Sequence, residues 1–242
     1  MTAARRLDRL LANLGYGSRA EVDRLVRARR IVLDGAAIDD HERRLVLTSD
    51  LPGRLLVDGA PLDPLPGLVV MMHKPLGVTC SHRETGRLVY DLLPSRWRRR
   101  KPPISSIGRL DRETSGLLLL TDDGPLLHRL ASPKHLIPKR YRVTLARPLR
   151  GDEAAVFASG TLILDGEDKP LLPAGIAIIS PTSAQVTIRE GRYHQVRRMF
   201  AAVGNHVDVL HREAVGGLAM SDDFLPGHFR VLDPADITRV VS

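Results

Sequence analysis

The sequence predicts an α+β protein of two domains, a small basic domain followed by a larger one built on a mixed, largely antiparallel sheet. Three observations support this prediction. Apolar residues near the N-terminus recur at helical spacing, a stretch rich in proline follows at residues 61–67, and beyond it short apolar runs are separated by turn residues. A chain of 242 residues is long enough for two separate cores, and we place the domains at residues 1–62 and 68–242.

The composition limits the classes of function. Hydrophobic residues make up 43% of the chain and charged residues 26%, which is typical of a globular protein. The net charge of +8 favours a polyanionic partner, and nucleic acid is the commonest one. The single cysteine, Cys80, leaves no partner for a disulfide within the chain and no cysteine zinc site. No apolar run approaches the length of a bilayer span, so we expect a cytoplasmic protein without a membrane partner.

Two short helices are predicted at the N-terminus. The first has its apolar positions one turn apart, at Leu7, Leu10, Leu11 and Leu14. Gly15 and Gly17 end it, and Ser18 begins the second helix. Glu21 stands three residues after Ser18, so the two side chains are spaced for a capping box.

The second helix carries a basic face, which is followed by two predicted hairpins around Asp34-Gly35 and Asp58-Gly59. A charged helix face is often only solvated, but the motifs Arg6-Leu7-Asp8 and Gly17-Ser18-Arg19-Ala20, with residues 31–35, resemble the S4 (α-L) RNA-binding domain over about residues 5–60. The resemblance implies a module that binds structured RNA by shape and phosphates. The predicted RNA-binding residues are Arg6, Arg19, Arg24, Arg27 and Arg30.

The second domain is predicted to mix strands and helices. The expected strands are residues 68–72, 117–121, 141–146 and 184–189, and the expected helices are residues 125–131, 152–158 and 195–203. A basic run from Arg96 to Lys101, with Trp97 inside it, admits two interpretations. It is either a solvated loop or a phosphate clamp in which Trp97 stacks on an exposed base.

The run Gly108-Arg109-Leu110-Asp111 is the most informative motif for chemistry. Its neighbours are polar and rich in turn residues, and an apolar strand follows, so the run is predicted to be a loop at the rim of the sheet. A lone aspartate in such a loop is usually a turn residue. Three further runs change this interpretation: Lys74-Pro75-Leu76-Gly77, Lys139-Arg140-Tyr141 and residues 190–200. In combination with the S4 motifs they resemble the RsuA-type branch of the pseudouridine synthases, over nearly the whole chain.

The resemblance implies a role for each matching position. Asp111 is expected to be the catalytic carboxylate, Arg197 to pair with it and keep it ionised, and Tyr141 to stack on the target base. Arg109 is expected to displace the uridine from its stack. The predicted substrate-binding residues are Arg109, Lys74, Arg192 and Gln195.

The chemistry of the reaction is consistent with this set. Pseudouridine forms when the C–N glycosidic bond breaks, the uracil turns, and its C5 joins the ribose, so no cofactor is needed. The base must leave its stack first, which costs a few kcal/mol, and an aromatic face recovers about 1–3 kcal/mol of this. The residues leave open whether Asp111 attacks C6 or C1′, or whether the reaction begins with proton loss at C2′.

The expected function is the isomerisation of one uridine in 16S ribosomal RNA, by a monomer whose partner is that RNA or a small-subunit assembly intermediate. The spacing of His194, His206 and His211 matches no zinc pattern, so no metal is expected. Three alternatives remain: the same reaction on a 23S or transfer RNA uridine, a non-catalytic assembly factor, and a hydrolase that releases free uracil.

Overall fold

The computed structural model describes residues 4–82 and 84–241, and its contacts divide the chain into two compact units. The first unit comprises residues 1–68 together with the segments 93–105 and 121–124. The second comprises residues 69–92, 106–120 and 125–242. None of the helices in the described ranges has the length and apolarity of a membrane span.

The first two helices of the first unit begin where the sequence predicts. Helix α1 (Leu7–Asn13) buries its leucines completely, and helix α2 (Arg19–Arg27) follows the N-cap Ser18. The capping box is formed in full: the Ser18 amide donates to Glu21 Oε2 at 2.7 Å, and the Glu21 amide donates to Ser18 Oγ at 3.3 Å. Both orphan donors are therefore satisfied, which typically stabilises a helix by about 1 kcal/mol.

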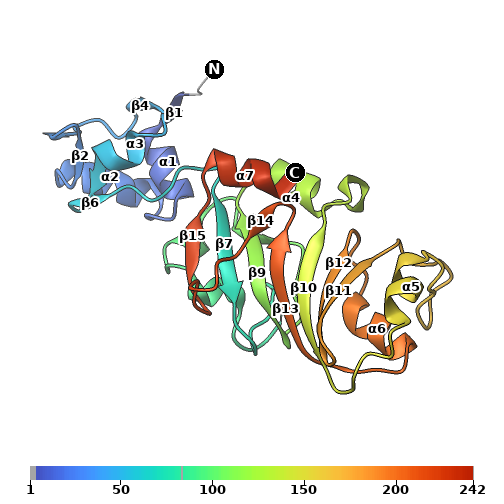
Figure 1. Ribbon diagram of the computed structural model, residues 1–242. Coiled ribbons are helices and arrows are strands. Elements are labelled where there is room, and N and C mark those ends of the chain that lie inside the picture. The colour runs from blue at the N-terminus through green and yellow to red at the C-terminus, as the bar shows by residue number, and fades with distance from the viewer. Residues whose placement is uncertain (1–3, 83, 242) are drawn as a thin grey trace. The chain divides into compact units, whose positions relative to one another are not determined.

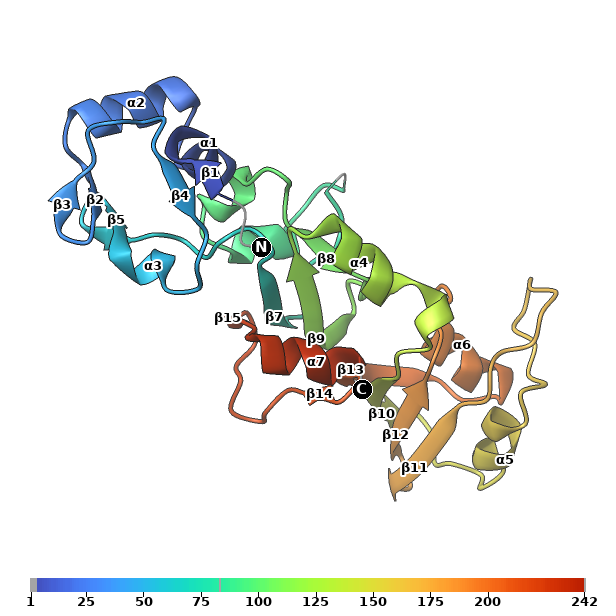
Figure 2. The same cartoon turned by 90° about the horizontal axis from the view of Figure 1, so that it is seen from above.

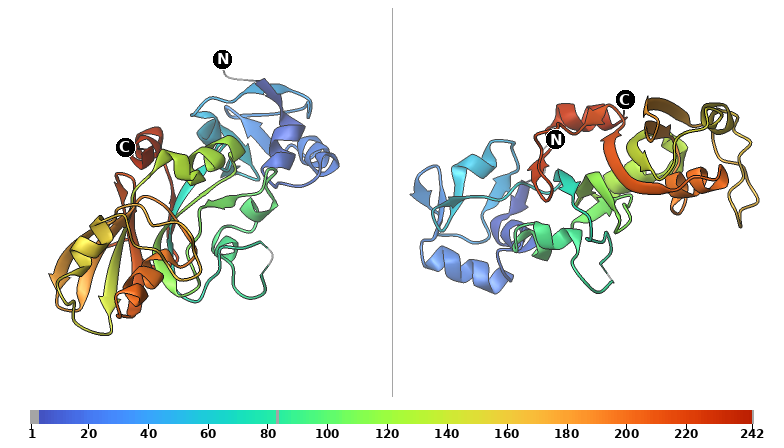
Figure 3. Two further views of the ribbon diagram at one scale, coloured as in Figure 1. Left: turned by 90° about the vertical axis from the view of Figure 1, so that its right-hand side faces the viewer. Right: turned by 60° about the horizontal axis from the view of Figure 1, so that its bottom comes forward.

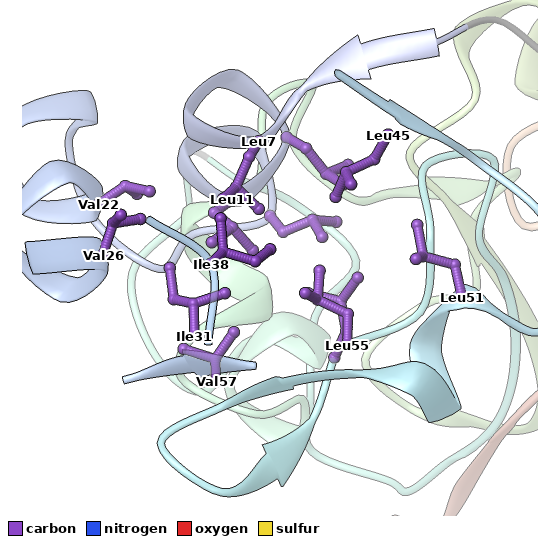
Figure 4. Packing of buried hydrophobic residues seen from close by; sticks show 13 residues of the cluster. Leu7, Leu11, Val22, Val26, Ile31, Ile38, Leu45, Leu51, Leu55 and Val57 are labelled. Atoms are coloured by element: carbon purple, nitrogen blue, oxygen red, sulfur yellow. The ribbon is translucent and has the colours of Figure 1, made fainter. Parts of the chain in front are cut away.

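Small sheets and a third short helix complete the core of the first unit. The remaining elements are β1 (Ala4–Arg6), β2 (Ile31–Leu33), β3 (Ala36–Ala37), β4 (Arg44–Val46), α3 (Leu51–Arg54), β5 (Leu55–Val57) and β6 (Ala60–Pro61). Strand β1 pairs with β4, and β3, β2, β5 and β6 form a second sheet in that order. Figure 4 shows the apolar side chains of α1 and α2 packed against Ile31, Ile38 and Leu55. The buried residues in this contact are at most 1% exposed, except Val26 of α2 at 3%.

The basic run at residues 96–101 is partly buried in this unit, which rules out base stacking by Trp97. Residues 97–99 form a 3₁₀ turn, η2 (Trp97–Arg99), and Trp97 is buried, so its ring is not available to stack on a base. The buried guanidinium of Arg100 lies 2.7 Å from Asp122 and also donates to the carbonyls of Pro64 and Leu65. An arginine held in this way binds protein carbonyls and a carboxylate rather than phosphate.

The second unit is built on a sheet of nine described strands, seven of which lie side by side in the order β11-β12-β10-β13-β9-β7-β15 (Figure 1). Strands β13 and β9 are parallel, and the other pairings with a recorded register are antiparallel. The strands are β7 (Val69–Lys74), β8 (Ser105–Ile107), β9 (Thr114–Thr121), β10 (Lys139–Leu145), β11 (Gly175–Ser180), β12 (Ser183–Ile188), β13 (Val207–Val215), β14 (Leu218–Ala219) and β15 (Phe229–Val231). The predicted fold class, a mixed and largely antiparallel sheet, is confirmed.

Helices pack against this sheet through their apolar faces. Figure 2 shows α7 (Pro234–Val241) alongside β14, and Figure 3 shows α5 (Glu153–Ala158), in yellow, beside the edge strand β11. Helix α4 (Gly124–Ala131) contributes Leu126 and Leu130 to a core that includes Leu117 and Leu119 of β9. Helix α6 (Gln195–Ala202) contacts β13, and two short turns, η1 (Val89–Leu92) and η3 (Pro133–His135), complete the unit.

Gly116 shows why one strand residue must be glycine. Its φ is +112°, and a Cβ built on it would lie 2.2 Å from the carbonyl oxygen of Arg212 on the parallel neighbour β13. No larger residue fits this approach without moving one strand. The glycine therefore brings β9, which directly follows the loop with Asp111, close to β13.

Candidate active site

The loop that carries Asp111, residues 108–113, connects β8 to β9. Its backbone is fastened near its C-terminal end: the Thr114 amide donates to Asp111 O at 3.0 Å, and the Gly77 amide donates to Arg112 O at 2.9 Å. The Asp111 side chain is 37% exposed, and its Oδ1 lies 3.4 Å from Nε2 of His194. The loop thus presents a partly open carboxylate beside an imidazole, as a rim loop on a sheet can do.

Asp111 lines a cleft of about 480 Å³ in the second unit. Tyr141 on β10 also lines it and is 8% exposed, so most of its ring is buried in the cleft wall. The register places Tyr141 opposite Arg212 of β13 on one side and Val186 of β12 on the other. The structure therefore brings the predicted carboxylate and the predicted stacking residue into one cavity.

Arg197 does not make the predicted pair with Asp111. In helix α6 its guanidinium donates to Val207 O and to Glu113 O, each at 2.7 Å. Among the described residues, the basic side chain within ion-pair distance of Asp111 is His194. Two carbonyls occupy the arginine because α6 places it between the start of β13 and the end of the Asp111 loop. Arg197 braces that loop instead of contacting the carboxylate itself.

Lys74 is also placed differently from the prediction. It was predicted to bind substrate, but it is completely buried, and its ammonium donates to Thr114 O at 2.8 Å and Pro75 O at 3.0 Å. Burial lowers the pKa of Lys74, although the nearby thiol of Cys80 and the carboxylate of Asp111 oppose this. A fully covered ammonium cannot reach RNA, so its position makes Lys74 a second brace beneath the Asp111 loop.

The other predicted substrate-binding residues line the same cleft. Arg109 is exposed and lies 3.3 Å from Glu84. Arg192 is paired with Glu167 and with Glu190, the latter at 3.1 Å. Gln195 is buried, accepts the Arg192 amide at 2.9 Å and donates to Glu190 at 3.1 Å. Arg192 and Gln195 therefore hold the turn before α6 in shape, whereas the exposed guanidinium of Arg109 remains accessible to RNA.

The predicted RNA-binding arginines of the first unit fall into two groups. Arg6 and Arg19 both bind the buried carboxylate of Asp8, at 2.9 and 2.7 Å. Burial would raise the pKa of Asp8, but the hydrogen bonds from these arginines and from the Arg9 amide outweigh it and hold the pKa at about 2. Arg24 and Arg27 are 72% and 77% exposed on α2, and their acidic neighbours lie one helical turn away.

Arg30 forms an ion pair with Asp58 across the hairpins of the first unit. Both side chains remain about half exposed, so this contact is solvated and worth little to stability. Arg19, Arg24, Arg27 and Arg30 all keep half or more of their side-chain surface exposed, and Arg6 and Arg19 are the two that neutralise Asp8.

Sequence reasoning missed several residues of the cleft. Lys139, Glu190 and Arg212 line it, but none of them was assigned a role. His194 was excluded as a metal ligand and assigned no catalytic role, yet it lies beside Asp111 and stacks on Tyr193 with 3.8 Å between ring centroids. A signal for Lys139 was present, since it precedes Tyr141 by two residues and alternate residues of a strand share a face. In the described ranges, no three His, Cys, Asp or Glu side chains gather as a metal site requires.

Comparisons with known proteins agree with this geometry. The family model described as RNA pseudouridylate synthase matches residues 68–202, and the S4 domain model matches residues 5–47. Ribosomal small subunit pseudouridine synthase A of Escherichia coli K12 is 40% identical over 98% of this chain and 100% of its own. The protein of the same name from Vibrio cholerae is 37% identical over 97% and 99%.

A solved structure supports the same family. The protein titled as a pseudouridylate synthase has 33% sequence identity, a TM-score of 0.68, and coverage of 98% of this chain and 99% of its own. Both the sequence match and the structural match extend over the S4 portion as well as the sheet domain. The chain therefore belongs to the RNA pseudouridine synthases, in the RsuA-type branch that carries an N-terminal S4 domain.

Proposed function

We propose that this protein converts one uridine of 16S ribosomal RNA into pseudouridine and that Asp111 is its catalytic carboxylate. The observation that carries the proposal is the shared cleft, in which Asp111 and the ring of Tyr141 line one cavity of about 480 Å³. That volume lies within the range of pockets that hold small ligands and is ample for one flipped-out base. The names of the relatives, which refer to the small ribosomal subunit, support the choice of RNA.

Each residue has a physical role in this proposal. The uridine leaves its stack and enters the cleft, where the Tyr141 ring offers a stacking surface worth about 1–3 kcal/mol. Arg109 projects from the Asp111 loop with an exposed guanidinium that can take the space left by the base. Asp111, partly open and adjacent to His194, acts on the ribose or the base. Arg197 and Lys74 hold the backbone that directly follows it, at Glu113 and Thr114, so the carboxylate is positioned before the RNA arrives.

The S4 domain, proposed to span residues 1–62, supplies affinity through phosphate contacts, and residues 68–242 form the proposed catalytic domain. The exposed arginines of α2 are placed for such contacts. We further propose that the protein works in the cytoplasm as a monomer, on 16S ribosomal RNA or a small-subunit assembly intermediate. The net charge of +8 supports an RNA partner.

The test is to map pseudouridine in ribosomal RNA from a strain lacking the gene, by carbodiimide modification and primer extension. One 16S site is expected to disappear and to return with the wild-type gene and with Asp208→Asn, a substitution of an exposed aspartate on β13. Asp111→Asn should not restore it. Loss of a site in 23S or transfer RNA instead would show that the substrate is that RNA. Loss of no site at all would favour the alternative of a non-catalytic assembly factor.

A further inference from the structure

Two cations in the wall of the cleft have no carboxylate partner. Among the described residues, no acidic side chain lies within ion-pair distance of Lys139 or Arg212. Asp111 lies beside His194, and the Glu190 oxygens accept from Arg192, Gln195 and the Leu172 amide. Arg212 is 3% exposed and is anchored through Nε to Leu117 O at 2.7 Å. Lys139 is half-buried and Arg212 is buried. Taking a cation out of water is costly without an anion, so the presence of both in a ligand cavity points to what the ligand carries.

The strand register places both cations around Tyr141. Lys139 lies two residues before Tyr141 on β10, and both side chains line the cleft, although the pairing of β10 with β13 is irregular between Arg140 and Tyr141. Arg212 is the register partner of Tyr141 on β13. Burial lowers the pKa of Lys139, and repulsion by Arg212 adds to this, whereas Glu190 partly opposes it. A base that stacks on Tyr141 would therefore lie between two positive charges.

A third polar group on this wall has no hydrogen-bond partner. The hydroxyl oxygen of Thr114 is buried without a hydrogen bond, and Thr114, which is 1% exposed, lines the cleft beside Leu210 of β13. Nearly all buried polar groups in proteins are satisfied, so an unsatisfied one in a ligand cavity indicates a polar atom of the ligand. Ammonium, guanidinium and hydroxyl groups together suit a ligand with several acceptor oxygens.

The depth of these groups favours the base over the phosphate. A phosphodiester remains attached to the RNA chain and stays near the mouth of the cleft, where the lining residue Arg109 is exposed. The flipped base is the part of the nucleotide that goes deepest. Uracil carries two carbonyl oxygens, O2 and O4, and it becomes anionic during the reaction.

We propose that Lys139 and Arg212 form a uracil-anion site, in which they stabilise the negative charge of the uracil ring while it is detached from the ribose. When the C1′–N1 bond breaks, its electron pair stays with the ring and spreads over O2 and O4. When C5 then bonds to C1′, the electron pair of the anion forms the new bond and the ring is neutral again. The C5 proton then leaves and N1 takes up a proton, so no atom is gained or lost overall. Cations that act mainly on the charged state lower the barrier to reaching it.

The turn of the ring explains why two cations are useful. A half-turn about the axis through N3 and C6 exchanges N1 with C5, and it also exchanges O2 with O4. Two cations beside Tyr141 can thus each face a carbonyl oxygen before and after the turn. The site holds the charged ring through its rotation without favouring the starting orientation.

This inference rests on the proposed function, and its test separates the two. RNA labelled with tritium at uridine C5 releases one tritium for each conversion, and single-turnover release is measured beside RNA binding. Lys139→Met should lower the rate about 10²-fold, as loss of one charge-stabilising donor does, with RNA affinity within about twofold of wild type. Lys139→Arg should recover most of the rate. Lys134→Met, which alters an exposed lysine of η3, should match the wild type.

Each other outcome has a definite meaning. If Lys139→Met releases tritium at the wild-type rate, the uracil-anion site is wrong. It is also wrong if the loss lies in RNA affinity, with a weaker salt dependence, because Lys139 would then contact phosphate. Thermal unfolding separates a structural role: the proposal expects Lys139→Met to be as stable as wild type or more, since an unpaired charge is removed. If Lys139→Met does not fold, Lys139→Gln is measured in its place, and the same results are expected. A wild-type protein that is inactive on every RNA refutes the proposed function instead of the uracil-anion site.

Discussion

The buried ammonium of Lys74 offers a quantitative test of how the Asp111 loop is held. Lys74→Met keeps most of the aliphatic side chain and removes hydrogen bonds to Thr114 O at 2.8 Å and Pro75 O at 3.0 Å. A hydrogen bond to a charged group contributes about 1.5–3 kcal/mol, so two contribute about 3–6 kcal/mol. The substitution also relieves the burial of the charge, which offsets part of this. We expect a net loss of about 3 kcal/mol in the free energy of unfolding.

Tryptophan fluorescence and circular dichroism report the unfolding of Lys74→Met in different parts of the chain. Trp97, the one tryptophan of the sequence, lies in the first unit, so its fluorescence reports that unit, while far-ultraviolet circular dichroism reports both. In urea, Lys74→Met should shift the circular dichroism transition to lower concentration and leave the Trp97 transition largely in place. Turnover should fall by up to about 10²-fold, because the loop with Asp111 loses a support.

Lys169→Met, an exposed lysine of the second unit, is the matched control and should behave as wild type. If Lys74→Met has the wild-type unfolding transition and turnover, the carbonyls are held without the ammonium and the bracing role of Lys74 is refuted.

Three further predictions concern the first unit. Asp8→Asn should cost about 2 kcal/mol at neutral pH, since the folded pKa of Asp8 is about 2 instead of 3.8. Because that pKa is depressed, the contribution is complete above about pH 4 and disappears as the pH falls toward 2. An equal cost in urea titrations at both ends of this range would contradict it. Arg24→Gln with Arg27→Gln should weaken RNA binding and reduce its salt slope by about 2, and an unchanged slope would exclude phosphate contacts. Trp97→Ala should cost about 3–5 kcal/mol by leaving a cavity, and lost RNA affinity at unchanged stability would restore a stacking role.

Local patterns predicted the elements of the fold because each was set by nearby residues. The leucines of α1 and the Ser18–Glu21 capping box need only helical spacing to act. Strand β13 was missed, although it lies in the middle of the sheet, because Asp208, His211, Arg212 and Glu213 obscure its alternation. Arg212 is buried there only because β9 supplies a carbonyl for it, and that partner is 95 residues away.

The site shows the same division between local and distant causes. Asp111 and Tyr141 were placed by the loop and strand around them, and both line the cleft. The contacts of Arg197 and Lys74 differ from the expected ones because long side chains take whichever acceptor the tertiary structure brings near, and here those acceptors are backbone carbonyls. Charge in the sequence likewise did not distinguish the buried Arg100, which pairs with Asp122, from an arginine that faces solvent.

The catalytic role of Asp111 is tested most directly by tritium release from C5-labelled 16S ribosomal RNA with purified wild-type protein and with Asp111→Asn. The substitution preserves the size of the side chain and removes its charge, and RNA affinity is measured on the same samples. The expected result is one tritium released per pseudouridine formed by the wild type, none by Asp111→Asn, and equal RNA affinity. Continued tritium release by Asp111→Asn would contradict the assignment of Asp111, and free uracil among the wild-type products would show hydrolysis in place of isomerisation.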